Sequence, residues 1–115
     1  DYLGRRRDAL VSAGIAQDQI ALDPGIGFGK TAQHNLQLLR SIDRLHGVGC
    51  PVLVGHSRKR FIGEVLGNAE ADRTAGTVGA SLALARRGVQ ILRVHDVAVV
   101  RQALLLFEAA GGLDR

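Results

Sequence analysis

The chain has 115 residues, of which 46% are hydrophobic, and a formal net charge of +4. This is enough apolar surface for one core, and no apolar run approaches the roughly 20 residues that cross a bilayer, so no membrane partner is expected. The positive charges are dispersed without interleaved aromatic residues, so no nucleic-acid partner is expected either. The start of the chain lacks a signal-peptide pattern, and the single Cys50 cannot form an internal disulfide and fits a reducing, cytoplasmic environment.

The hydrophobic pattern predicts helices that alternate with short buried strands. In chain order we expect a helix that stops at Gly14, a strand over 20–22, a helix over 31–46, a strand over 51–55, a helix capped by Ser57 and closed by Gly67, a helix capped by Asp72 and ended by Gly88, a strand over 89–95, and a helix capped by Asp96. Such alternation indicates an α/β fold with parallel strands under helical cover. Three strands leave two open edges, and a complete (β/α)8 barrel takes roughly 250 residues. The chain is therefore expected to be the C-terminal part of a larger domain.

Polar side chains follow all three predicted strands. Asp23 ends the first strand, Ser57 lies just past Gly55 after the second, and Arg93 and His95 come at the end of the third. Ligands of α/β folds bind at the carboxyl ends of the strands. The sequence therefore predicts one site where these three strand ends meet.

The loop 23–30 holds three glycines between an acid and a lysine. Its end, Gly29-Lys30-Thr31, fits a nucleotide phosphate loop, but Pro24 stands where that motif needs glycine and has no N–H to offer a phosphate. Nucleotide binding is therefore disfavoured. Asp23 has two interpretations that stay open: a carboxylate that caps the turn, or an acceptor for the two N–H groups of an amidine-like heterocycle edge.

Cationic side chains follow the second and third strands. Ser57-Arg58-Lys59 is either an ordinary helix cap with two solvated cations or an anion site at a helix start. Arg93 and His95 are two residues apart on a strand and should point to the same side, a pairing that a polyanion such as diphosphate would compensate. A zinc role for His95 is disfavoured because no second His or Cys lies at ligand spacing. His56 is close enough to line the site.

Three segments together resemble the C-terminal signatures of the dihydropteroate synthase family. They are 23–30, 54–63 and 93–97, in the family's order and spacing, with Gln33-His34-Asn35 also in place. The resemblance implies a (β/α)8 TIM barrel in which this chain supplies strands 6–8 with their helices. Residues 1–115 would then be the C-terminal portion of a single pterin-binding domain whose N-terminal half is absent.

The resemblance also implies the reaction and the residues that serve it. The family joins 4-aminobenzoate to 6-hydroxymethyl-7,8-dihydropterin diphosphate in folate biosynthesis, forming 7,8-dihydropteroate and releasing diphosphate. The implied pterin contacts are Asp23, Gly27, Phe28, Lys59 and Arg93; the 4-aminobenzoate contacts are Phe28, Ser57 and Lys59; the diphosphate contacts are Arg93 and His95; and the catalytic residues are Lys59, Arg93 and His95.

Further expectations come from the same resemblance. A Mg²⁺ ion would be bound by the absent half, with no metal ligand in this segment, and the protein would be a homodimer with the helix over 72–87 as a candidate contact. Alone, the chain should be inactive or nearly so. Two alternatives remain: the pterin-binding domain of a corrinoid methyltransferase, and a non-catalytic half-barrel module.

Overall fold

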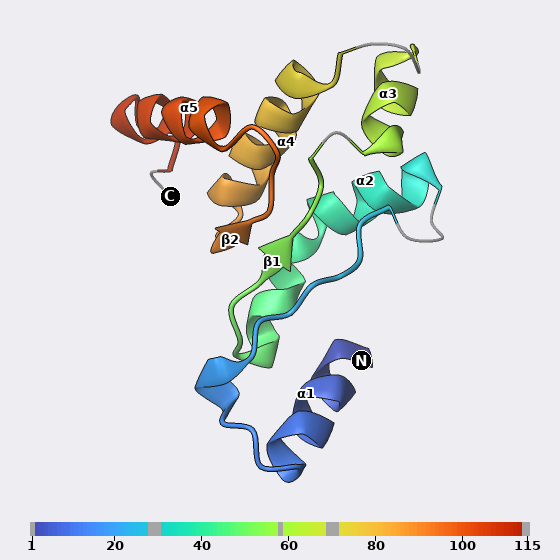
Figure 1. Cartoon of the computed structure of the whole chain (residues 1–115), viewed down its shortest axis with the longest axis vertical. Coiled ribbons are helices and arrows are strands. Elements are labelled where there is room, and N and C mark those ends of the chain that lie inside the picture. Colours follow the sequence, from blue (N-terminus) through green and yellow to red (C-terminus); the bar gives the residue numbers. More distant parts are fainter. Residues whose placement is uncertain (1, 28–30, 58, 69–71, 114–115) are drawn as a thin grey trace.

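The computed structural model describes residues 2–27, 31–57, 59–68 and 72–113. Figure 1 shows strands β1 and β2 side by side, with α2 next to β1 and α3 next to α2, while α4 and α5 come from the C-terminal part of the chain. The elements, in order, are α1 (Tyr2–Ser12), the 3-10 helix η1 (Gln17–Gln19), α2 (Ala32–Arg40), the 3-10 helix η2 (Ile42–Val48), β1 (Leu53–Val54), α3 (Arg60–Leu66), α4 (Thr74–Arg86), β2 (Ile91–Leu92) and α5 (Val97–Ala109). None of the helices among these described residues is long and apolar enough to cross a membrane.

Three strand segments pair in parallel, as predicted. Leu22 forms a parallel bridge with Val52, and β1 pairs in parallel with β2, so that Leu53 lies opposite Ile91. The Leu53 N–H donates to the Leu22 carbonyl at 2.8 Å, and the Arg93 N–H donates to the Val54 carbonyl at 3.0 Å. The fold is therefore α/β with parallel strands, in the predicted order.

The strands are shorter than the sequence predicts. The segment 20–22 makes a single bridge instead of a strand, and β2 covers only Ile91–Leu92 of the predicted 89–95. Just before β2, the side-chain oxygen of Gln90 accepts the Val52 N–H at 2.9 Å. A side chain thus replaces the backbone partner that a longer ladder would supply.

Helices cover one face of this small sheet and leave the other face open. Leu22, Val52 and Val54 are buried, whereas Ile91 is 40% exposed and Arg93 is also exposed. Side chains alternate between the two faces of a strand, so buried and exposed positions along it separate by face. The main core cluster consists of Ile26, Ile42, Val52, Val54, Phe61, Ile62, Leu84 and Val89.

Two predicted helix boundaries are wrong. The helix expected over 31–46 divides: α2 ends at Arg40, and η2 follows, which buries Ile42 and Val48. Ser57 is not the cap of α3, because that helix begins at Arg60 with Lys59 in the N-cap position. The Ser57 hydroxyl contacts the third strand end instead.

Other helix boundaries lie close to the predicted ones, although Arg73 and not Asp72 occupies the N-cap position of α4. Thr31 caps α2 by accepting the His34 N–H at 3.2 Å. Asp72 accepts hydrogen bonds from the backbone N–H and the hydroxyl of Thr74, at 2.9 and 2.8 Å, where α4 begins. Gly14 follows α1 with φ of 102°, a left-handed conformation that glycine adopts at little cost.

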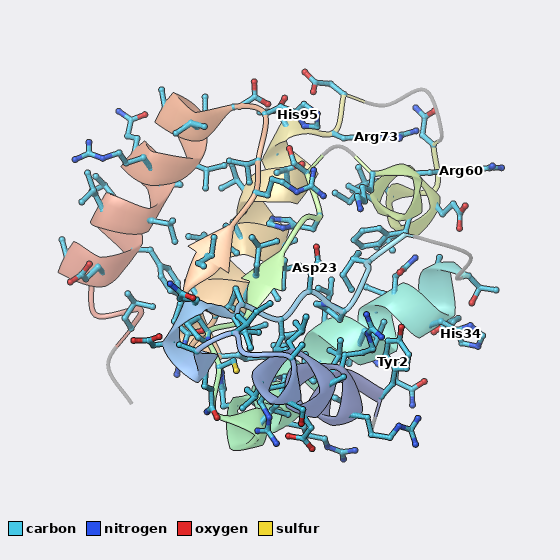
Figure 2. All side chains as sticks on the ribbon, turned by 60° about the horizontal axis from the view of Figure 1, so that its bottom comes forward. Tyr2, Asp23, His34, Arg60, Arg73 and His95 are labelled. Carbon is cyan, nitrogen blue, oxygen red and sulfur yellow. The ribbon has the colours of Figure 1, made fainter. Side chains whose placement is uncertain are left out.

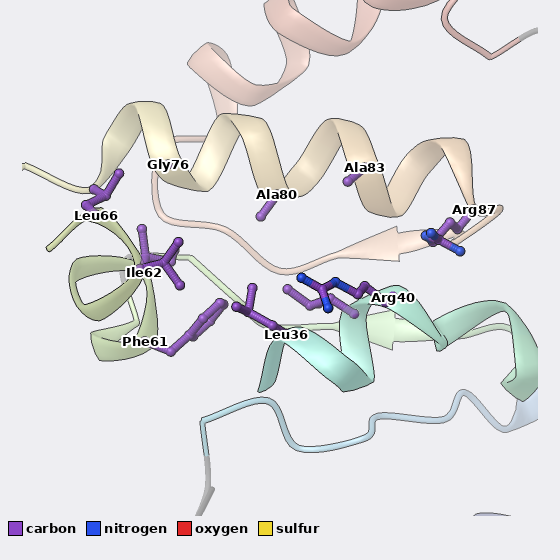
Figure 3. Close-up of a pocket in the computed structure, with 11 residues that line it drawn as sticks. Leu36, Arg40, Phe61, Ile62, Leu66, Gly76, Ala80, Ala83 and Arg87 are labelled. Atoms are coloured by element: carbon purple, nitrogen blue, oxygen red, sulfur yellow. The ribbon is translucent and has the colours of Figure 1, made fainter. Parts of the chain in front are cut away.

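The small residues of α4 allow close packing against α3. A Cβ added at Gly76 would collide with the Ile62 side chain, so a larger residue there would separate the two helices. Beside this contact, α2, α3 and α4 enclose an apolar cavity of about 310 Å³ with Arg40 and Arg87 on its rim. Figure 3 shows Phe61 on α3 and Leu36 on α2, with Ala80 and Ala83 across from them on α4.

His56 is a core residue, and the prediction that it lines the site is wrong. Its side chain is fully buried, and its Nε2 lies 2.7 Å from the Ser81 hydroxyl. That hydroxyl donates its one proton to the Thr77 carbonyl at 2.7 Å, so His56 donates to it from Nε2. Within the described part of the chain its Nδ1 is buried without a hydrogen-bond partner.

Burial lowers the pKa of His56 below its ordinary value. The Lys59 ammonium lowers it further, while the carbonyls of Val54 and Thr77 act in the opposite direction. A depressed folded-state pKa means that folding favours the neutral ring. The stability that this contributes is complete above the unfolded pKa of about 6.5 and is lost as the pH falls below it.

We predict that the free energy of unfolding falls as the pH is lowered from about 7 to about 5, and that His56→Gln reduces this slope. Glutamine can still donate to Ser81 but takes up no proton. Urea denaturation of the full-length protein across this pH range measures the slope. His34→Gln, which replaces an exposed imidazole on α2, is the matched control; equal slopes in the wild type and His56→Gln would contradict the prediction.

Candidate functional site

The carboxyl ends of the three paired segments form one edge, and the predicted site residues lie along it. Asp23 directly follows Leu22, Ser57 lies three residues after β1, and Arg93 directly follows β2. Figure 2 labels Asp23 and His95, which come from the two loops on either side of β1. Phe28, also predicted for this site, lies outside the described residues.

Asp23 caps its own turn. One carboxylate oxygen accepts the Gly25 N–H at 2.8 Å, and Asp23 is exposed at the rim. The turn-capping interpretation is therefore confirmed. The same hydrogen bond constrains the direction of the carboxylate.

Lys59 connects the loop that follows β1 to the loop that follows Leu22. Its ammonium donates to the Ile26 carbonyl at 2.5 Å, and its side chain lies across Gly27, where an added Cβ would be 2.9 Å from Lys59 Cδ. Gly27 also has φ of 89°, which residues with a Cβ rarely adopt. Glycine at this position thus allows both the backbone conformation of the turn and the close approach of the Lys59 side chain.

Asn35 is a site residue for which the sequence predicted no role. Its side-chain oxygen accepts the Gly27 N–H at 2.8 Å, and only 1% of the residue is exposed. Asn35 and Lys59 thus hold the loop at two neighbouring residues, Gly27 and Ile26 respectively. The signal was available: Asn35 is the polar member of the helical series 35, 38, 39 and 42, whose other members are Leu38, Leu39 and Ile42.

The third loop is tied to the second at two points. The Arg93 guanidinium lies directly over Gly55, where a Cβ would collide with it. The His95 N–H donates to the Ser57 hydroxyl oxygen at 3.0 Å, and His95 Nδ1 lies 2.9 Å from the same oxygen. Val94 turns the other way and lines a cavity with the α5 residues Val97 and Val100. Arg93 and His95 therefore contact the same neighbouring loop, although the strand on which that prediction rests ends at Leu92.

The site is cationic and open. Arg93 and His95 are exposed, so no core has to accommodate their charges. No carboxylate is paired with Arg93 within the described part of the chain, so its guanidinium is available to an anion. The expected anion site at the start of a helix is not present at Ser57, because α3 starts three residues later. In these ranges no three His, Cys, Asp or Glu side chains form a metal-binding group.

Comparisons with known proteins agree with this arrangement. A family model described as pterin binding enzyme matches residues 1–95. The dihydropteroate synthase of Neisseria meningitidis serogroup C is 47% identical over 112 residues, covering 96% of this chain and 40% of that protein. The chain therefore spans about 40% of the length of this curated relative.

Solved structures give the same result. The dihydropteroate synthase of Xanthomonas albilineans is 47% identical, with a TM-score of 0.90, in complexes with 7,8-dihydropteroate and with 4-aminobenzoic acid. Each match covers 95% of this chain, and 43% and 42% of the respective solved chains. From the family match and the likeness of sequence and structure, the chain belongs to the family of pterin binding enzymes and is similar, within it, to the dihydropteroate synthases.

Proposed function

We propose that the full-length protein is a dihydropteroate synthase, a transferase that joins 4-aminobenzoate to 6-hydroxymethyl-7,8-dihydropterin diphosphate in folate biosynthesis. The observation that carries this proposal is the contact of three loops at one sheet edge, through Lys59 to Ile26 and Ser57 to His95. The X. albilineans enzyme, solved with 7,8-dihydropteroate, has the same local fold with a TM-score of 0.90.

The chain would supply strands 6–8 and their helices to a (β/α)8 barrel, as residues 1–115 of one domain. One face of the parallel sheet is covered by helices and the other is open, which is how part of a barrel wall would be built. The open face carries Ile91 and Arg93. In the complete barrel this face would turn toward the axis, with Asp23 and Arg93 at its catalytic end.

Each site residue then has a chemical task. The Asp23 carboxylate would accept hydrogen bonds from the amino-pyrimidine edge of the pterin, and Gly27 and Phe28 would line the pocket. Lys59 would lie between the pterin and 4-aminobenzoate, and Ser57 would contact the latter. Arg93 would pack against the pterin and, with His95, bind the diphosphate.

The reaction is a substitution at the pterin methylene carbon. The amine nitrogen of 4-aminobenzoate forms a bond to this carbon while the bond from carbon to the diphosphate oxygen breaks, and the electron pair leaves with diphosphate. The nitrogen then loses a proton, for which no strong base is needed. Because negative charge grows on the leaving group, cations such as Arg93 lower the barrier most effectively there.

A Mg²⁺ ion is also proposed, with its ligands outside this chain. Among the described residues no group of three or more His, Cys, Asp or Glu side chains could hold it. Pterin-dependent corrinoid methyl transfer and non-catalytic binding remain the alternatives. Titration of a pterin and 4-aminobenzoate, followed by an assay for dihydropteroate, separates them.

We predict that Arg93→Ala lowers kcat of the full-length enzyme by about 100-fold or more, because a donor to the leaving group is lost. Initial rates of dihydropteroate formation measure this. Arg60→Ala is the matched control, since its side chain is 87% exposed and pairs only with Glu64 on the same helix among the described residues. Similar rates for both variants would exclude the proposed role.

We also predict that residues 1–115 expressed alone show no measurable synthase activity, whereas the full-length protein is active. The isolated segment leaves the open face of the sheet, and thus half of the pocket, in water. Rates for both proteins at equal concentration test this. Turnover by the isolated segment would refute it. An intact gene whose product has a mass near 12.2 kDa would refute the separate proposal that these residues are part of a larger protein.

Finally, we propose that the enzyme works in the cytoplasm as a homodimer with α4 in the contact. The α4 face beside the apolar cavity presents small residues, and Val65 and Leu66 next to it are 53% and 51% exposed. Apolar side chains exposed together are typical of interfaces. A second copy of the chain is the occupant that this proposal requires.

We predict that Ala83→Arg, which adds a bulky cation to exposed α4 surface, shifts the full-length protein from dimer to monomer. Light scattering coupled to size-exclusion chromatography measures the mass. Gln102→Arg, on the exposed surface of α5, should leave the dimer intact. A dimer that survives Ala83→Arg would show that α4 is not the contact.

A further inference from the structure

The Ser57 hydroxyl and His95 make a two-point contact that the proposed reaction does not yet use. The His95 backbone N–H lies 3.0 Å from Ser57 Oγ, and the ring atom Nδ1 lies 2.9 Å from it. Ser57 is only 5% exposed, and it does not cap α3. Its side chain therefore contacts the loop that follows β2 and not the start of α3.

The direction of the first hydrogen bond follows from the chemistry of its donor, and the proton that remains on Ser57 suggests the direction of the second. A backbone N–H can only donate, so Ser57 Oγ accepts from His95. The hydroxyl keeps one proton to donate, and, within the described ranges, Nδ1 of His95 is the acceptor in contact with it. With Nδ1 accepting, the neutral imidazole carries its proton on Nε2.

We propose that Ser57 is a positioning residue that fixes the ring orientation and the Nε2–H tautomer of His95. The ring would then present an N–H donor to an oxygen of the departing diphosphate. This step rests on the proposed function, which supplies the identity of the anion. The tautomer is inferred from the contact with Ser57 and not from the identity of the anion.

The proposal changes what Ser57 is expected to do for 4-aminobenzoate. A hydroxyl has a single proton, so while that proton lies on the bond to Nδ1 the group cannot also donate to a carboxylate. If Ser57 acts through His95, its loss weakens diphosphate binding. If Ser57 is only a direct contact, its loss raises KM for 4-aminobenzoate.

Ser57→Ala and Ser57→Thr in the full-length protein test this, because threonine keeps the hydroxyl. Two-bond ¹H–¹⁵N spectra should show His95 as the Nε2–H tautomer in the wild type and Ser57→Thr, and a tautomer mixture in Ser57→Ala. Titration with inorganic diphosphate should give an affinity about tenfold weaker for Ser57→Ala, with Ser57→Thr close to the wild type.

A double-mutant cycle with His95→Ala completes the experiment. Once His95 is removed, Ser57→Ala should cost little further diphosphate affinity, since its effect runs through the ring. An Nδ1–H tautomer in the wild type, or a Ser57→Ala defect confined to KM for 4-aminobenzoate, would overturn the proposal. A wild-type protein that forms no dihydropteroate would instead sink the proposed function, while the tautomer measurement would still stand.

Discussion

Parallel backbone pairing at the centre of the sheet is the constraint on which the site depends. The bridge from Leu22 to Val52 and the ladder from Leu53 to Ile91 run in the same direction, so all three chain segments leave the sheet at one edge. An antiparallel arrangement of the same segments would send their polar ends to opposite edges. The site is thus a consequence of topology before any side chain is considered.

Two glycines, which have no Cβ atom, allow cationic side chains to lie against the backbone at this edge. Gly27 and Gly55 lie under the side chains of Lys59 and Arg93, respectively, and a methyl group at either position would push the cation away. Asn35 fixes the Gly27 backbone from the buried side. The lysine and arginine are therefore placed by backbone that lies beneath them, a firmer support than mobile side-chain neighbours would give.

The sequence predicts the parallel order of the strands better than it predicts their lengths or individual contacts. Short apolar runs that alternate with helices were sufficient for the parallel order, because local pattern and fold class are coupled. Serine favours helix caps, which predicts a cap at Ser57, but its tertiary contact with His95 prevails. The position of His56 in the chain predicts that it lines the site, and only its contact with Ser81 on α4 reveals its burial.

The open face of the sheet explains why the proposed site needs to be enclosed by further strands before it can catalyse the reaction. Asp23, Arg93 and His95 are all exposed, and in water the attraction between unit charges at contact is worth only about 1 kcal/mol. Enclosing the same groups in a pocket lowers the local dielectric and strengthens each interaction with a developing negative charge. In the proposed barrel, the remaining strands would supply that enclosure. The three loops fix the direction of the charged groups, and enclosure by the remaining strands would strengthen their electrostatic interactions with the substrate.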